Sequence, residues 1–209
     1  MVKITIFVEG GGDTRNQQSA CRKGFREFFN KLDIKASITI IACGNGKNTY
    51  DDFCIGFKKT KIDEYCLLLV DSEAAIKNSN KWQHFCSYID AKSIKPNNAK
   101  EEHLHFMVEC MEAWFMADKE TLANYYGKDF NLNALPKKTD IEKIAKQDLI
   151  DGLDNATRKT LKGKYSKSKR EHSFELLSKI SSEKVIKQSL HAKTLYEILK
   201  EPKEYLSSN

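Results

Sequence analysis

The sequence predicts an α/β protein, in which a mostly parallel sheet is flanked by helices and followed by a helical C-terminal subdomain. Two apolar segments, 2–8 and 64–70, have the composition of buried strands. Strand and helix patterns alternate along the first half of the chain, which is the order of parallel βαβ units. Beyond Tyr126 only helical patterns follow. We therefore expect an α/β core over residues 1–126 and a helical extension packed on it over residues 127–209.

The first strand, 2–8, shows no polar alternation, so we expect it at the centre of the sheet. The next segment, from about residue 18 to 32, has the apolar spacing of one helix face. The residues on that face are Phe25, Phe28, Phe29 and Leu32. A helix with this face packs on the sheet.

A second strand is predicted over 37–42, and a turn at 44–46 precedes a helix through Phe53, Ile55 and Phe57. Because a strand precedes Gly46-Lys47, the segment invites comparison with a phosphate-binding P-loop. Ile41 stands where that loop needs a glycine, and Asn48 stands where it needs Ser or Thr. We interpret the segment as a plain turn.

The third strand, 64–70, is followed by a short helix around 82–89 and a fourth strand over 103–108. The run 109–118 has helical periodicity, and Asp118 is placed to cap a helix that follows it.

In the C-terminal part, Thr139 and Glu142 have the spacing of a capping box. The segment 173–180 is amphipathic, and apolar residues between 185 and 199 predict one last helix.

Composition and charge limit the classes of protein to which this chain can belong. The 209 residues include 35 Lys and Arg against 29 Asp and Glu, a net charge of +6 that favours anionic partners. No apolar run approaches the ~18 residues of a membrane span, and the N-terminus does not resemble a signal peptide. We expect no membrane association and a cytoplasmic location. The six cysteines are scattered singly along the sequence, so we expect most of them to be reduced residues of the core.

Acidic residues follow two of the predicted strands at their carboxyl ends. Glu9 follows the first strand, and Asp71 and Glu73 follow the third. Open α/β sheets place their sites at this edge, and carboxylates are the ligands that Mg²⁺ prefers. We therefore predict a catalytic site for Mg²⁺ or Mn²⁺ at Glu9, Asp71 and Glu73. Glu9 could also act as a general acid or base.

Three further carboxylates are candidate metal ligands, each with a structural alternative. Asp13 follows the glycines and could equally cap the next helix. Glu112 and Asp118 could form a second metal position, or they could be a helix-face residue and a helix N-cap. Gly10, Gly11 and Gly12 allow the backbone to approach a phosphate closely and offer it amide groups.

Seven basic residues and no acidic one lie in the segment 158–170. Such a segment is either a solvated loop or a site of phosphate neutralisation. Lys167, Lys169 and the nearby His172 are the candidates for phosphate binding.

These residues also carry a resemblance to a known family. A strand followed by Glu9-Gly10, with a later strand followed by Asp71-x-Glu73, resembles the Toprim domain. Its signature is a glutamate after the first strand and an Asp-x-Asp pair after the third, from which Glu73 departs by one methylene. Nearly the whole chain also resembles a group of small Toprim-like bacterial proteins. These proteins are related to the overcoming-lysogenisation-defect nucleases. The segments that carry this wider resemblance are Met111-Glu-Ala-Trp-Phe-Met-Ala-Asp118 and Lys169-Arg-Glu-His172.

The resemblance implies a Toprim-like, Rossmann-like fold and a metal-dependent nuclease that cleaves phosphodiester bonds in DNA or RNA, with water as the nucleophile. It also implies an ATPase encoded nearby as a partner, and a role in bacterial defence. The alternative is a non-catalytic Toprim-like module that binds nucleic acid or an ATPase, with the acids in structural roles. No sequence signal indicates the oligomeric state.

Overall fold

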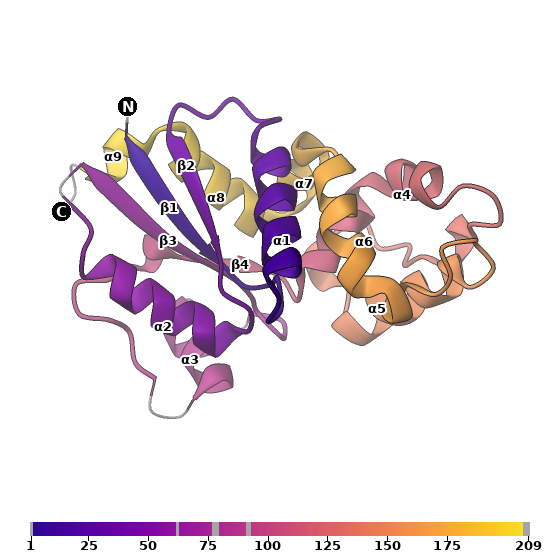
Figure 1. Ribbon diagram of the computed structural model, residues 1–209, viewed down its shortest axis with the longest axis horizontal. Coiled ribbons are helices and arrows are strands. Elements are labelled where there is room, and N and C mark those ends of the chain that lie inside the picture. Colours follow the sequence, from indigo (N-terminus) through magenta and orange to yellow (C-terminus); the bar gives the residue numbers. More distant parts are fainter. Residues whose placement is uncertain (1, 62, 77–79, 91–92, 207–209) are drawn as a thin grey trace.

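The computed structural model describes residues 2–61, 63–76, 80–90 and 93–206, with the backbone alone for 167–171, 204 and 206. Its centre is a sheet of four parallel strands in the order β2-β1-β3-β4 (Figure 1). The strands are β1 (Lys3–Val8), β2 (Ser37–Ala42), β3 (Glu64–Asp71) and β4 (Leu104–Met107). The predicted fold class is confirmed: the protein is α/β, with a parallel sheet flanked by helices, as in Rossmann-like folds.

Helices fill most of the remaining described chain. The α-helices are α1 (Arg15–Phe29), α2 (Gly46–Phe57), α3 (Lys81–Ile89), α4 (Lys119–Tyr126), α5 (Lys146–Thr157), α6 (Tyr165–Lys179), α7 (Ser182–Gln188), α8 (Leu190–Lys200) and α9 (Pro202–Leu206). Short 3₁₀ helices are η1 (Glu101–His103), η2 (Met111–Asp118), η3 (Leu132–Ala134) and η4 (Ile141–Lys143). No helix in the described ranges combines the length and apolar composition needed to cross a membrane.

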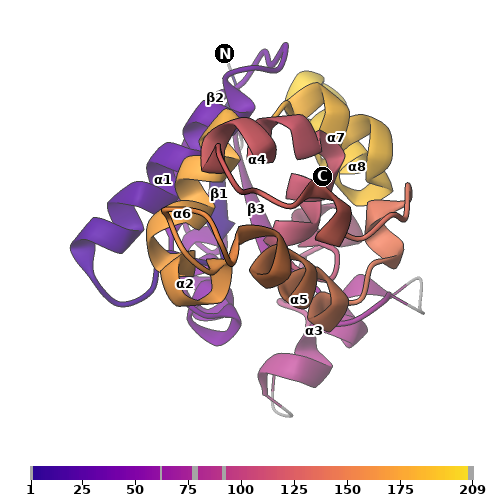
Figure 2. The same ribbon diagram turned by 90° about the vertical axis from the view of Figure 1, so that its right-hand side faces the viewer.

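The core divides between the two faces of the sheet, because successive strand residues point to opposite sides. Ile4 and Ile6 belong to a cluster with α1, η2, α6, α7 and α8, whereas Phe7 belongs to a second cluster with α2 and α3. β1 lies between β2 and β3, as predicted. Seen from the side of α4, α5 and α6, the sheet lies behind these helices (Figure 2).

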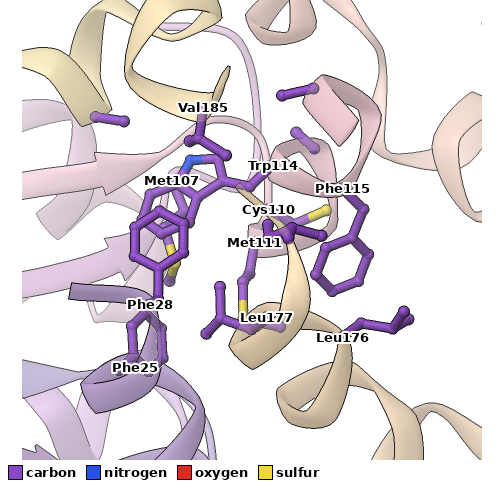
Figure 3. Packing of buried hydrophobic residues seen from close by; sticks show 14 of the residues in the cluster. Phe25, Phe28, Met107, Cys110, Met111, Trp114, Phe115, Leu176, Leu177 and Val185 are labelled. Carbon is purple, nitrogen blue, oxygen red and sulfur yellow. The ribbon is translucent and has the colours of Figure 1, made fainter. Parts of the chain in front are cut away.

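Trp114 of η2 joins the C-terminal helices to the sheet layer. Its ring stacks on Phe28 of α1, with centroids 5.0 Å apart, and lies near Val185 of α7 (Figure 3). Each such buried side chain contributes roughly 1.5–3 kcal/mol. The helices after Tyr126 therefore share one continuous core with one face of the sheet.

The first helix begins earlier than its apolar pattern predicts. The Thr14 hydroxyl accepts a hydrogen bond from Gln17 N at 3.3 Å and starts α1 at Arg15, so the predicted start near residue 18 is too late. Such a cap satisfies a free N–H of the first turn.

The prediction of a plain turn through Gly46-Lys47-Asn48 is wrong, because these residues form the first turn of α2. The Asn45 side chain accepts a hydrogen bond from Asn48 N at 2.9 Å and caps this helix. The helix predicted over 109–118 is instead the 3₁₀ helix η2, and all eight of its residues are buried.

Two C-terminal predictions are corrected as well. The capping residue near 139–142 is Asp140, whose side chain accepts from Glu142 N at 3.2 Å, and the helix there is only the short η4. The single last helix is divided at Ser189, whose hydroxyl accepts from Ala192 N at 3.0 Å and starts α8.

Candidate functional site

Glu9 lies immediately after β1 and reaches the end of the neighbouring strand β3. The backbone N–H of Asp71 donates to Glu9 Oε2 at 3.1 Å. On another side lies the first turn of α2, where a Cβ added to Gly46 would stand 3.4 Å from the same oxygen. The Gly46 amide also stabilises the carboxylate. Because helix N-termini favour anions, the start of α2 offsets part of the cost of burying this carboxylate.

Asp71, the last residue of β3, connects the sheet to η2. The N–H of Met111, the first residue of η2, donates to Asp71 Oδ1 at 2.9 Å. The structure therefore brings the carboxyl groups of Glu9 and Asp71 together at the carboxyl ends of two neighbouring strands.

Burial and negative neighbours raise the pKa of both groups. Burial, together with the charge of Glu73, raises the pKa of Glu9 to about 7, against the opposing effects of the Asp71 N–H and Lys146. Burial and the charges of Glu9 and Glu112 raise the pKa of Asp71 well above its usual range. The two ionised carboxylates destabilise each other, so a cation between them would stabilise the site.

Glu73 completes the predicted trio, but its side chain is turned toward Lys146. Lys146 Nζ lies 2.6 Å from Glu73 Oε2, and the two side chains are 34% and 42% exposed. The backbone of Glu73 is left-handed, with φ 60°, a conformation that costs a residue with a Cβ roughly 1–2 kcal/mol. Such local strain is common at functional sites.

Glu112 lies close to this pair, on the buried first turn of η2. It is 1% exposed, and its Oε1 accepts a hydrogen bond from Tyr165 Oη of α6 at 2.8 Å. Its charge contributes to the raised pKa of Asp71. We call Glu9, Asp71, Glu73 and Glu112 the acidic cluster.

The chain matches the family described as a domain of unknown function (DUF4276) over residues 8–200, nearly its whole length. The chain belongs to this family. No curated protein and no solved structure matches it. In this DUF4276 chain the matched region contains the whole acidic cluster, so the site lies within the family's own domain.

The donor chemistry of the acidic cluster fits Mg²⁺ or Mn²⁺, which take hard oxygen ligands and retain several waters. As the side chains stand, however, no three Asp, Glu, His or Cys groups of the described residues are arranged to hold an ion. Glu73 is turned to Lys146, but its side chain is 42% exposed. It can therefore rotate toward Asp71 without disturbing the core.

The glycines after Glu9, which the sequence makes candidates for phosphate binding, all adopt positive φ angles. The φ angles are 131° at Gly10, 88° at Gly11 and 54° at Gly12. Gly10 N donates to Gly44 O at 2.7 Å, so this amide is not available to a phosphate. Asp13 is exposed. Its alternative role as the N-cap of the next helix is wrong, because Thr14 caps α1.

The structure places Asp118 away from the other acids, at the far end of η2. Seven residues of 3₁₀ helix at ~2.0 Å each separate it from Met111 by roughly 14 Å. Asp118 occupies the N-cap position of α4, but its side chain does not bond that helix's backbone. It accepts instead from Lys184 Nζ at 2.6 Å and from Ser181 N at 2.9 Å. The second metal position predicted for Glu112 and Asp118 is therefore not formed as the side chains stand, because the two residues lie at opposite ends of η2 and Asp118 is bonded to Lys184 and Ser181.

The basic segment 158–170 is only partly a loop, because α6 begins at Tyr165. Ser166 N donates to Asp154 at 2.7 Å, which places an acid beside this segment. The side chains of Lys167 and Lys169 lie outside the described atoms. His172 Nδ1 is 2.7 Å from Tyr125 Oη and is therefore engaged with α4.

Two residues at the site were missed by sequence reasoning. Lys146 N donates to Glu109 Oε2 at 2.7 Å at the start of α5, while Lys146 Nζ reaches Glu73. Glu109 in turn accepts from Glu73 N through its carbonyl at 2.9 Å. Glu73 and Lys146 are 73 positions apart in the sequence, which leaves no local signal for this pair.

Proposed function

We propose that this protein is a metal-dependent phosphodiester-cleaving enzyme of the Toprim type that acts on nucleic acid. The observation that carries the proposal is the convergence of Glu9 and Asp71 at neighbouring strand ends, where burial and the charges of neighbouring carboxylates raise the pKa of both. This arrangement is unfavourable without a cation and favourable with one.

Glu9, Asp71 and Glu73 would hold Mg²⁺ or Mn²⁺, and the ion would supply Lewis-acid activation of water and of the phosphate oxygen. In the reaction, water adds to phosphorus and a P–O ester bond breaks, which leaves a phosphate monoester and an alcohol. The Lys146 ammonium, 2.6 Å from Glu73, is near enough to neutralise a phosphate oxygen bound beside this carboxylate.

The substrate class is proposed from charge. The chain has a net charge of +6, and the basic segment 158–170 ends on the first turns of α6. From α6, Tyr165 contacts Glu112 of the acidic cluster. A nucleic acid bound along α6 would therefore pass close to the acids. An ATPase partner and a role in bacterial defence rest on the family resemblance described above.

The rival function is a non-catalytic module that binds nucleic acid or an ATPase. It is favoured by the ion pair of Lys146 with Glu73, because an internal ammonium can neutralise part of the acidic cluster without any metal. Under this alternative the acids stabilise the fold and no substrate is cleaved.

The test is a cleavage assay with wild type and Asp71→Asn on single- and double-stranded DNA and RNA, with Mg²⁺, Mn²⁺ or chelator. We expect metal-dependent cleavage by wild type and none by Asp71→Asn, with nucleic-acid binding retained or tighter because a repelling charge is removed. Asp129→Asn is the matched control, since Asp129 is exposed, has φ 67° and tolerates Asn. Any ATPase encoded beside the gene is added in a parallel set. Absence of cleavage under all conditions would favour the binding module.

A further inference from the structure

A cavity lies at the opposite end of the sheet from the acidic cluster. Its volume is about 1100 Å³, and it is bounded by the end of α2, the start of β3 and the segment 94–100. β3 begins at this cavity with Glu64 and ends at Asp71, so at ~3.3 Å per residue the two sites are roughly 23 Å apart. Ligand pockets typically measure about 300–1,000 Å³, so this one can hold an organic molecule.

The walls of this cavity are held in place by hydrogen bonds. Tyr50 Oη of α2 donates to the carbonyl of Ile94 at 2.6 Å, and Trp82 Nε1 donates to the carbonyl of Lys100 at 3.0 Å. Lys100 N donates to His103 Nδ1 at 2.9 Å. The segment 94–100 is therefore fixed against α2 and α3 around the cavity.

Four lining residues carry aromatic rings: Tyr50 and Phe57 are partly exposed, and Tyr65 and His103 are buried. His103 stacks on Tyr65 with centroids 4.8 Å apart and meets the edge of Phe57 at 5.0 Å. Tyr65 is 2% exposed, and its hydroxyl has no hydrogen-bond partner within the described chain. A buried hydroxyl without a partner is unfavourable, and a polar atom of a ligand could satisfy it once the surrounding side chains move to expose it.

The charge of the lining is positive. Its acidic member is Glu64, whereas four lysines line it: Lys58, Lys61, Lys95 and Lys100. Lys58, Lys61 and Lys95 are exposed, and none of these three forms an ion pair with a described residue. A ligand suited to this cavity therefore combines a planar aromatic ring with a negative group.

We propose that the cavity binds a nucleoside monophosphate, with its base against the aromatic rings and its phosphate near the exposed lysines. An inorganic anion would leave most of the volume empty, and an uncharged aromatic would leave the lysines without a counter-charge. The proposal does not depend on cleavage at the acidic cluster.

The test titrates the full chain with AMP, GMP, CMP and UMP by calorimetry, in the presence of chelator. We expect at least one nucleotide to bind with a dissociation constant of about 10–100 µM, and adenosine or inorganic phosphate alone to bind at least about tenfold more weakly. Asp71→Asn should bind the nucleotide as wild type does, which separates this cavity from the acidic cluster.

Charge reversal supplies the matched variants. Lys58→Glu, Lys61→Glu and Lys95→Glu together should weaken nucleotide binding at least about tenfold. The control carries the same charge change at exposed lysines outside the lining: Lys23→Glu, Lys128→Glu and Lys187→Glu. Equal loss in both variants, equally tight binding of phosphate alone, or no nucleotide binding at all would overturn the proposal.

The cysteine Cys54 reports the location directly, because it lines the cavity and is partly exposed, whereas Cys21, Cys43, Cys86 and Cys110 are buried outside the lining. Bound nucleotide should slow alkylation of Cys54, measured by peptide mass spectrometry, more than it slows alkylation of those four. Unchanged Cys54 alkylation at a saturating nucleotide concentration would place the ligand elsewhere and contradict the proposal.

Discussion

At the scale of single residues, the charges of Glu9 and Asp71 are disfavoured first by burial, and then by the charge of Glu73 on Glu9 and by those of Glu9 and Glu112 on Asp71. The Glu9 carboxyl has an ordinary pKa of 4.5, which burial and the neighbouring charge raise to about 7 in the folded protein. A carboxyl whose pKa is higher in the folded state binds its proton more tightly there than in the unfolded chain. Its contribution to stability is therefore complete at low pH and is lost as pH rises from about 4.5 to about 7.

The first prediction follows from the direction of this pKa shift. It concerns the protein without metal, in the presence of chelator. Glu9→Gln should raise the free energy of unfolding at about pH 8 by roughly 2–3 kcal/mol, and should change it little near pH 4.5. The reason is that glutamine removes the charge that the folded state disfavours. Urea unfolding at the two pH values measures the difference.

Glu27→Gln provides the control, since Glu27 is exposed on α1. It should leave the pH dependence of stability as in wild type. A Glu9→Gln variant that is less stable than wild type at the higher pH would show that Glu9 is a structural anion, held by the N-terminus of α2, and that the folded state does not disfavour its charge.

At the scale of elements, the tight contact of α1 with α6 depends on a glycine. A Cβ added to Gly24 would lie 2.6 Å from the carbonyl oxygen of Phe174 and 3.0 Å from its Cβ. Gly24 therefore lets the two helices approach each other to backbone contact, which positions α6 and its Tyr165 beside the acidic cluster.

The second prediction is that Gly24→Ala lowers the free energy of unfolding by about 1–3 kcal/mol, although alanine is the better helix former. The added methyl group must displace the backbone of α6. Lys23→Ala, on the neighbouring exposed position, should change stability by no more than about 0.5 kcal/mol. Equal stability of Gly24→Ala and wild type would mean that α1 and α6 are packed less closely than the structure shows.

The elements differ in how well the sequence predicts them. β1, β2 and β3 lie where their apolar runs place them, because a run bounded by polar residues fits a short buried strand. The sequence predicts η2 as helical but does not predict its 3₁₀ form, since all eight of its residues are buried and no exposed face marks its period.

The residues of the candidate site also differ in how well the sequence predicts them. Glu9 and Asp71 are predictable because each follows a strand directly, and parallel strands bring their carboxyl ends to one edge. Lys146 is not predictable, because the loop and helices that bring it to Glu73 leave no pattern in either local sequence. The break between α7 and α8 at Ser189 is not predictable either. A hydroxyl cap sets it, and the apolar periodicity carries no sign of that cap.

At the scale of the whole molecule, the third prediction concerns the basic segment 158–170. Charge reversal of Lys164, Lys167 and Lys169 should weaken nucleic-acid binding and reduce the slope of log K against log salt by about one for each phosphate that the protein no longer neutralises. The same reversal at Lys128, Lys187 and Lys193 is the control and should leave the slope nearer to that of wild type. If the reversal at Lys164, Lys167 and Lys169 leaves the salt slope unchanged, the segment 158–170 is solvated surface and does not bind nucleic acid.

The central claim is that the acids at the ends of β1 and β3 form a divalent-cation site, and calorimetric titration with Mn²⁺ tests it most directly. Wild type should bind Mn²⁺, and Glu9→Gln and Asp71→Asn should each bind it at least about tenfold more weakly, because each loses a charged ligand. Asp129→Asn should bind as wild type, and Lys146→Met should bind more tightly because a competing cation is removed. No Mn²⁺ binding by wild type, or equal binding by Asp71→Asn, would contradict the claim.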